Sequence, residues 1–178
     1  MNSDAISVTL HAPGLLLRPW EDGDLGAVVA AYSDPAHVRW LDSQIADEAD
    51  GRKWLADQHA GRVSGKLLSF AVIGTGEGQL AGCMVLKRPD PAGTVGEIGY
   101  WTVAAARGRG VAAAAVEAVA QWAYGTLGLA RLDILHTVGN EASCRVAEKA
   151  GFAFAEILPA TPPWPHDGHR HIRHAPSR

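Results

Sequence analysis

The residues from position 107 to 112 combine glycines with positive charge in a way that suits phosphate binding. They are Arg107, Gly108, Arg109, Gly110, Val111 and Ala112, and an alanine-rich segment follows them. The first turn of a helix has unpaired backbone N–H groups and about half a positive charge from the helix dipole. Glycines there let the backbone approach a phosphate closely, so the stretch predicts a pyrophosphate-bearing cofactor. The structural alternative is a glycine-rich helix start with two solvated arginines.

Two cofactor classes fit this stretch. Read as Gly108-x-Gly110-x-x-Ala113, it matches the dinucleotide fingerprint, and Asp133 lies at about the distance where that fingerprint places an acidic residue. Against this, a glycine-rich hairpin precedes the stretch, and the first glycine does not follow its strand directly. Asp133 also begins a strand instead of ending one. An oxidoreductase that binds NAD(P) therefore stays the weaker alternative.

Read as Arg107-x-x-Gly110-x-Ala112, the stretch resembles the acyl-CoA pyrophosphate loop of the GNAT superfamily of N-acetyltransferases. Three further segments carry the same resemblance in the family's order: LLLRPW at 15–20, EIGYWTV at 97–103, and HTVGNEAS at 136–143 followed by EKAGF at 148–152. The first of them resembles the opening of one branch, the ribosomal-protein N-terminal (alanine/serine) acetyltransferases. Together the motifs cover about residues 14–158.

The resemblance implies a fold, a cosubstrate and a reaction. The fold is α/β (α+β): one GNAT-type domain over residues 1–178, with its core at 14–158 and a C-terminal segment at 159–178. Its mixed, mostly antiparallel sheet is flanked by helices and contains a splayed central strand pair. Acetyl-CoA lies in that splay, with the strand N–H groups of Thr102 and Val103 on its pantetheine arm. An amine then attacks the thioester directly, and many such proteins form homodimers.

Catalysis requires a neutral amine, a polarised carbonyl and a proton for the leaving thiolate. Glu97, on the predicted central strand, is the candidate base, and its alternative role is a structural hydrogen bond. Many family members place a tyrosine acid where this chain has Ala147, so Ser143 becomes the candidate proton donor. Asn140 is predicted both to cap the helix and to contact the pantetheine arm. If neither Glu97 nor Ser143 acts, the chain is a non-catalytic acyl-CoA-binding or regulatory domain.

The acceptor side is less well defined by the sequence. Tyr100, Trp101 and His136 are candidates for lining the substrate, with packing as the alternative for each. Trp20, Trp40 and Trp54 could belong either to the core or to the acceptor wall. Three acidic residues could attract a cationic amine or be simply solvated: Asp42, Asp47 and Glu48. The acceptor is expected to be a peptide N-terminus or a small-molecule amine.

Histidines gather near the C-terminus at positions 166, 169, 171 and 174. His169 and His171 share a face only if a strand forms there, and no acidic partner is fixed nearby, so no metal is predicted. Cys83 and Cys144 have no metal-ligand spacing and are expected to be small, reduced, buried thiols.

Hydrophobic periodicity predicts the elements that position these residues. Strands are expected at 14–18, 67–73, 80–86, 95–103, 131–138 and 152–158, and helices at 22–32, 47–59, 111–127 and 140–150. The turn at 74–78 makes an antiparallel hairpin of the second and third strands, and the last dozen residues could add a final strand.

Composition excludes several classes of protein. The chain has 178 residues, a net charge of −3, 47% hydrophobic and 20% charged residues. This balance excludes a disordered chain and gives no support for nucleic-acid binding. No apolar run is long enough for a membrane span, and the first nine residues lack the features of a secretory signal, so a cytoplasmic protein is expected.

Overall fold

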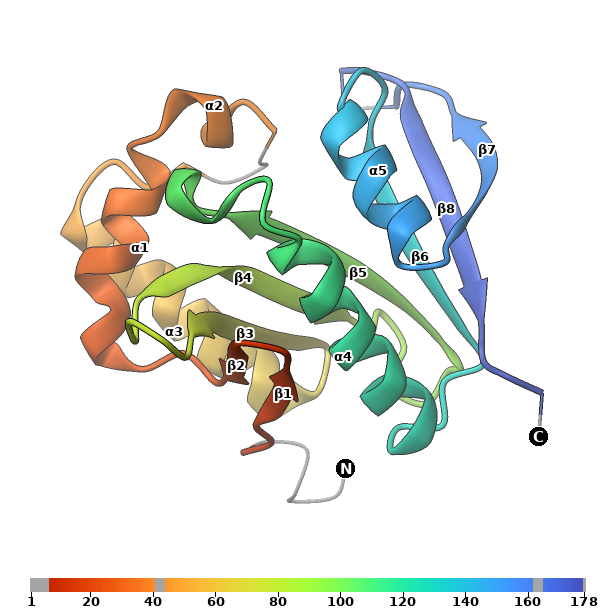
Figure 1. Cartoon of the computed structure of the whole chain (residues 1–178), viewed down its shortest axis with the longest axis horizontal. Helices are drawn as coiled ribbons and strands as arrows, with labels where there is room; N and C mark the ends of the chain where they lie inside the picture. Colours follow the sequence, from red (N-terminus) through yellow and green to blue (C-terminus); the bar gives the residue numbers. More distant parts are fainter. Residues whose placement is uncertain (1–6, 41–43, 162–164, 178) are drawn as a thin grey trace.

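The computed structural model describes residues 7–40, 44–161 and 165–177. Its strands form one eight-stranded sheet in the order β1-β2-β3-β4-β5-β6-β8-β7 (Figure 1). The strands are β1 (Leu10–Ala12), β2 (Leu15–Arg18), β3 (Leu67–Gly74), β4 (Leu80–Lys87), β5 (Val95–Thr102), β6 (Arg131–Thr137), β7 (Ala153–Leu158) and β8 (Gly168–His174). The helices are α1 (Leu25–Tyr32), α2 (Pro35–Val38), α3 (Glu48–Ser64), α4 (Val111–Gly125) and α5 (Glu141–Lys149), with short 3-10 turns η2 (Asp22–Asp24) and η3 (Ala104–Ala106).

The pairing of β5 with β6 divides the sheet into two parts. Every other pair of neighbouring strands is antiparallel, but β5 and β6 are parallel and pair only from Val95 to Ile98 and from Arg131 to Ile134. Beyond those residues the two strands diverge toward their carboxyl ends, as Figure 1 shows. The predicted α/β class and mixed, mostly antiparallel sheet are confirmed. The dinucleotide alternative is wrong, because that fold requires a mostly parallel sheet.

Two apolar layers cover the sheet, because alternate side chains of a strand point to opposite faces. On one face, Leu68 and Phe70 of β3 pack with the small and β-branched residues of α4, including Ala115 and Val119. On the other face, Ala71 packs in a second cluster with residues of α1 and α3. The alanines of α4 are fully buried at several positions, so this helix lies close to the sheet.

The helix boundaries follow from local capping chemistry. The side chain of Asp47 accepts a hydrogen bond from the Asp50 N–H, and α3 ends at Gly65, whose φ is 73°. Helix α3 is therefore longer than the 47–59 predicted. Two elements were missed: β1, which has only three residues, and α2, a single turn that begins at Pro35. The final strand does form, and it lies between β6 and β7.

Candidate functional site

The glycine-rich turn between β5 and α4 exposes the backbone groups that the sequence predicts. Gly108 and Gly110 adopt φ values of 73° and 79°, in the left-handed region that favours glycine. The first helical bond of α4 runs from the Ala114 N–H to the Gly110 carbonyl, and no side chain caps the helix. The N–H groups of Val111 to Ala113 therefore point out of the first turn, which contains no acidic residue. This turn can accept an anion.

The two arginines of the turn have different surroundings. The Arg107 guanidinium donates to an Asp34 carboxylate oxygen at 2.7 Å and to the Thr102 carbonyl at 3.3 Å, so it ties the turn to the segment after α1. The predicted contact between Arg107 and the cofactor must therefore be made by the Arg107 backbone, or the Arg107–Asp34 pair must open. Arg109 is exposed. Sequence reasoning missed Lys149, whose ammonium lies 3.5 Å from the position that a Cβ on Gly110 would take.

Successive residues of β5 direct their backbone N–H and C=O groups alternately toward β4 and away from it. This alternation determines which residues offer their backbone groups to the gap beside β6. The Val103 N–H donates to the Ala81 carbonyl at 3.0 Å, so its amide is directed toward β4. Thr102 and Tyr100, one and three residues earlier, therefore direct their backbone groups to the opposite edge, where β6 has diverged. Thr102 therefore directs its backbone groups toward the gap, and its contact with the pantetheine arm stays a prediction. The prediction for the Val103 N–H is wrong, because that group is already bonded to β4.

Tyr100 spans the gap on the face covered by α4 and α5. Its hydroxyl donates to the Ser143 carbonyl at 3.2 Å, and burial raises its pKa to about 12, so the phenol stays protonated. The Asn140 side chain accepts from the Ser143 N–H at 3.2 Å, which is the predicted N-cap of α5. Tyr100 of β5 thus meets the start of α5, with Asn140 and Ser143, across the gap.

Glu97 lies near the amino end of β5, on the opposite face of the sheet from Tyr100. Its carboxylate accepts a hydrogen bond from the Lys87 ammonium of β4 at 2.7 Å, and its side chain is 30% exposed. The Glu97 carboxylate is thus partly open to solvent while one of its oxygens is bonded to the Lys87 ammonium.

The predicted aromatic lining residues are separated by the fold. Trp101 is 9% exposed and packs with Trp20 and Tyr32 beneath α1, so its predicted role in lining the substrate is wrong. Trp20 is buried in the core, and Trp54 packs against it edge-on. Only Trp40 among the three tryptophans that the sequence leaves open is exposed, at 37%.

Of the acidic residues proposed to attract an amine, Asp47 caps α3. Glu48 pairs with Arg52 one turn along that helix. Asp42 lies outside the described residues.

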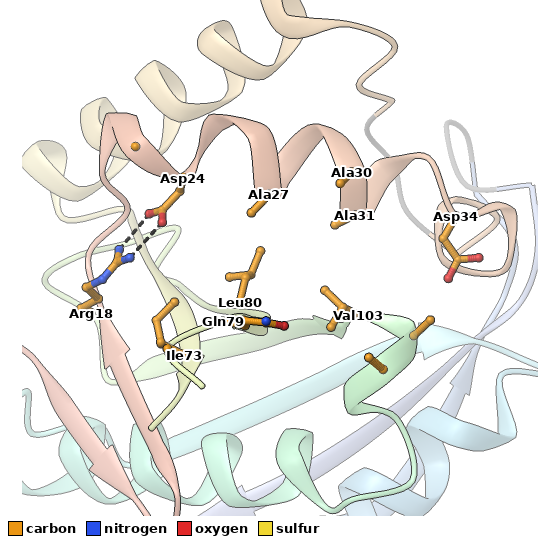
Figure 2. A pocket seen from close by; sticks show the side chains of 14 residues that line it. Arg18, Asp24, Ala27, Ala30, Ala31, Asp34, Ile73, Gln79, Leu80 and Val103 are labelled. Atoms are coloured by element: carbon orange, nitrogen blue, oxygen red, sulfur yellow. Dashed lines mark hydrogen bonds and ion pairs between the residues drawn. The ribbon is translucent and has the colours of Figure 1, made fainter. Parts of the chain in front are cut away.

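Two cavities adjoin these elements. The larger, of about 590 Å³, lies between α1 and the ends of β3, β4 and β5 (Figure 2). Its carboxylates are both paired, Asp24 with Arg18 and Asp34 with Arg107, so neither presents an uncompensated negative charge. The smaller, of about 240 Å³, lies between the Trp40 segment and the start of α5, and Asn140 is part of its lining.

His136 has a different environment from the lining role predicted. It points away from β6 into a cluster with Cys144, His169 and His171, all of whose ligand-type atoms lie within 4.8 Å of one another. The strand that the metal hypothesis required has formed, and His169 and His171 share one face of it. The condition that the sequence sets for a shared histidine site is therefore met.

In the part of the chain that the structure describes, no helix is both long enough and apolar enough to cross a membrane.

Comparison with known proteins gives one family and many similar folds. The family model described as "Acetyltransferase (GNAT) domain" matches residues 14–153. The curated protein named "Putative ribosomal N-acetyltransferase YdaF", from Bacillus subtilis (strain 168), is 37% identical over 76 residues. That match covers 43% of this chain and 42% of the relative, so the aligned part spans less than half of the relative's length.

Solved structures match over almost the whole chain. An acetyltransferase (GNAT family) from Bacillus anthracis superposes with a TM-score of 0.83 at 24% identity, covering 94% of this chain and 98% of that one. RimL, a ribosomal L7/L12 alpha-N-protein acetyltransferase solved in complex with coenzyme A, gives a TM-score of 0.84 at 19% identity, with coverage of 94% and 98%. At these identities, the two structures establish the fold.

Proposed function

The chain belongs to the GNAT acetyltransferase family, and we propose that it transfers the acetyl group of acetyl-CoA directly to a primary amine. The observation that carries this proposal is the divergence of β5 from β6 directly before the uncapped, glycine-rich start of α4. A thioester arm in that gap can bond to the free edge of β5 while its pyrophosphate lies on the helix start.

The pyrophosphate contacts fall mainly to backbone groups. The N–H groups of Val111 to Ala113 would donate to phosphate oxygens, and the left-handed Gly108 and Gly110 keep side chains out of the approach. Lys149 and Arg109 would add positive charge on either side of the turn. Arg107 is a positioning residue, because its guanidinium holds the turn to Asp34.

The reacting groups would approach from opposite faces of the sheet. The amine nitrogen attacks the thioester carbonyl carbon, the carbon–sulfur bond breaks, and the thiolate takes up a proton. Glu97, on the α1 and α3 face, would remove the proton lost by the amine, directly or through water. The Ser143 hydroxyl, on the α5 wall, would supply the proton to sulfur, and a β5 N–H would polarise the carbonyl oxygen.

The acceptor that this arrangement favours is a peptide α-amino group. Such an amine has a pKa of about 7.7–8.0, so roughly 10–20% of it is already neutral at pH 7, whereas a lysine side chain is almost entirely protonated. An amine that is already partly neutral requires less help from a general base, and the candidate base Glu97 shares its carboxylate with Lys87. The names of YdaF and RimL, both acetyltransferases of ribosomal proteins, support the same acceptor class.

Mass spectrometry with matched peptides tests this proposal. Each peptide begins with Ala or Ser and contains one internal lysine, and its control carries a blocked N-terminus. We expect acetyl-CoA-dependent acetylation on the free α-amine and no reaction with the blocked peptide. Acetylation of the lysine alone would refute the acceptor class, and silence across peptides and small amines would refute the enzyme.

The alternative of a non-catalytic acyl-CoA-binding domain makes a different prediction. It binds acetyl-CoA in a calorimetric titration but releases no thiol with any amine. It also leaves the combined Glu97→Gln and Ser143→Ala variant indistinguishable from the wild type.

Self-association through the sheet edge is a further part of the proposal. Strand β7 is the last strand of the sheet, and its Phe154 and Ile157 are 54% and 55% exposed. An apolar edge strand offers unpaired backbone groups to a second copy. Sedimentation analysis should give a dimer for the wild type and a monomer for Ile157→Asp; a monomeric wild type would refute this part.

A further inference from the structure

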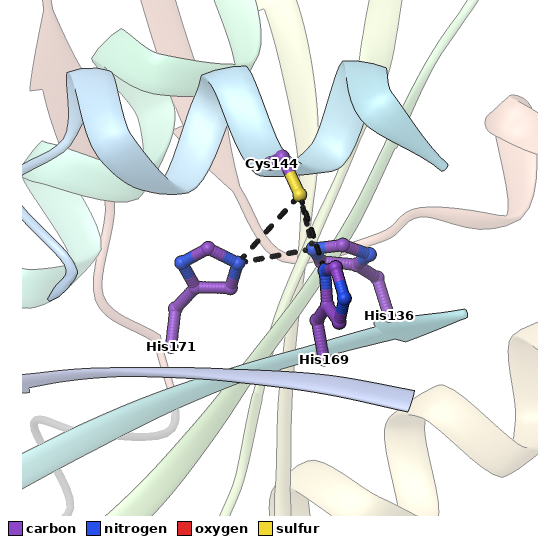
Figure 3. Close-up of side chains that lie close together, drawn as sticks. All are labelled: His136, Cys144, His169 and His171. Atoms are coloured by element: carbon purple, nitrogen blue, oxygen red, sulfur yellow. Dashed lines mark hydrogen bonds between the residues drawn. The ribbon is translucent and has the colours of Figure 1, made fainter. Parts of the chain in front are cut away.

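Four side chains with metal-ligating atoms converge on the side of the gap formed by β6, β8 and α5. His136 comes from β6, His169 and His171 from β8, and Cys144 from α5 above them (Figure 3). His136 is directly opposite His169 in the antiparallel register, and His171 follows two residues along the same face. The three imidazoles therefore lie on one face of two paired strands, with the thiol facing them.

Four distances within this cluster are close to those of a tetrahedral coordination shell, and all four ligand atoms lie within 4.8 Å of one another. The Cys144 Sγ lies 3.4 Å from His136 Nε2, 3.4 Å from His169 Nδ1 and 3.8 Å from His171 Nε2. The two Nε2 atoms of His136 and His171 lie 3.2 Å apart. A tetrahedral zinc with ordinary Zn–S and Zn–N bonds requires separations of about 3.5 Å from sulfur to nitrogen and about 3.3 Å between nitrogens.

The hydrogen bonds of the histidine rings also favour metal binding by the cluster. If the His136 Nδ1–H donates to the Thr137 carbonyl, 3.0 Å away, its Nε2 carries a lone pair directed into the cluster. Ligating histidines commonly use such a backbone bond to fix their tautomer. His171 is 1% exposed and turns its own Nε2 toward the same point.

We propose that His136, Cys144, His169 and His171 bind one zinc ion in a closed tetrahedral site. Imidazole nitrogen with thiolate sulfur suits zinc, and four protein ligands with no position left for water make the site structural. The Phe154 ring of β7 packs edge-on against His169 and His171, which limits access of solvent to the cluster.

Such an ion would fix the far wall of the gap. Residues from two strands and a helix would bind the same ion. One of them, Cys144, directly follows Ser143 in the first turn of α5. The metal would therefore hold the start of α5 against β6 and β8, and with it the positions of Asn140 and Ser143. The site is independent of the proposed acetyl transfer, because it can bind metal whether or not the chain is catalytic.

Cobalt substitution of the full chain, expressed without a histidine tag, tests the site without requiring any variant to fold. We expect apoprotein to take up one Co²⁺ per chain, with the strong visible bands of tetrahedral cobalt and a thiolate-to-metal charge-transfer band. Zinc should displace cobalt stoichiometrically and raise the thermal midpoint. Weak octahedral cobalt bands, or no uptake by protein that is folded by circular dichroism and binds CoA, would overturn the proposal in favour of a hydrogen-bonded His–Cys cluster.

Single variants then identify the ligands. Cys144→Ala should abolish the charge-transfer band, and His171→Asn should weaken zinc binding by more than about 100-fold, since loss of an outer partner alone costs about 10- to 100-fold. The matched control is His174→Ala, an exposed histidine on the same strand, which should bind zinc as the wild type does. Zinc binding retained in full by both ligand variants, or lost equally in the control, would contradict the assignment.

Discussion

Replacing Gly110 with alanine separates the two roles of the glycine-rich turn, its backbone conformation and its access to an anion. Gly110 caps α4 with a φ of 79°, where an L-residue is disfavoured by about 1–2 kcal/mol. A Cβ there meets no backbone atom and lies 3.5 Å from the Lys149 ammonium. The free energy of unfolding should therefore fall by about 1–2 kcal/mol, which lowers the thermal midpoint by about 2–8 °C in a domain of this size.

The loss of binding free energy for CoA should exceed this loss of folding stability. The added methyl group would lie between the α4 N–H groups and Lys149, where a phosphate is expected. Loss of one charge-assisted hydrogen bond costs about 1.5–3 kcal/mol, so calorimetric titration should show CoA binding weakened about 10- to 100-fold.

The matched control for Gly110→Ala is Gly128→Ala. Gly128 has a φ of 68° and open space around its Cβ position, in the turn after α4. It should lose similar stability and bind CoA normally. If Gly110→Ala binds CoA as tightly as Gly128→Ala, the helix start does not hold the pyrophosphate.

Three further predictions concern single side chains. Asp24 is buried, which raises its pKa, but hydrogen bonds from Arg18 and the Glu21 N–H outweigh this and leave the pKa below its usual value. Its stabilising effect is therefore complete above the ordinary pKa of aspartate and lost as the pH falls through the lowered one. Asp24→Asn should cost about 1–3 kcal/mol at pH 7, a difference that shrinks in acid unfolding curves and would contradict the pairing if it did not. Glu97→Gln should lower kcat by about 100-fold in a thiol-release assay, with KM for acetyl-CoA unchanged; an unaltered kcat would exclude it as the base. Tyr100→Phe should destabilise the fold by about 0.5–1.5 kcal/mol in denaturant titrations, and no loss would show that its hydroxyl bond is inconsequential.

The sequence predicts local elements well because their signals are local. The hairpin of β3 and β4 follows from a glycine-rich turn between two apolar runs, and the cap of α5 follows from Asn140 three residues before Ser143. The start of α4 follows from the spacing of Gly108 and Gly110. Each of these features depends on residues that are adjacent in the chain, so no tertiary information is needed to recognise them.

The features that were missed depend on residues far apart in the sequence. The pairing of Arg107 with Asp34 joins positions 73 residues apart, and nothing in either segment indicates it. Alternation along β5 shows that Tyr100 and Trp101 face opposite ways but not which of them faces the gap. The histidine cluster requires β8 to insert beside β6 and place His169 opposite His136, a topology that periodicity does not specify.

Hydrogen–deuterium exchange with and without acetyl-CoA tests most directly whether the cosubstrate lies between β5 and β6. We expect slower exchange on binding at the amides of residues 111–113 and at Tyr100 and Thr102. The Val103 amide, already bonded to Ala81, should change less. Protection confined to the cavity between α1 and the β3–β4 hairpin, with α4 unchanged, would contradict it.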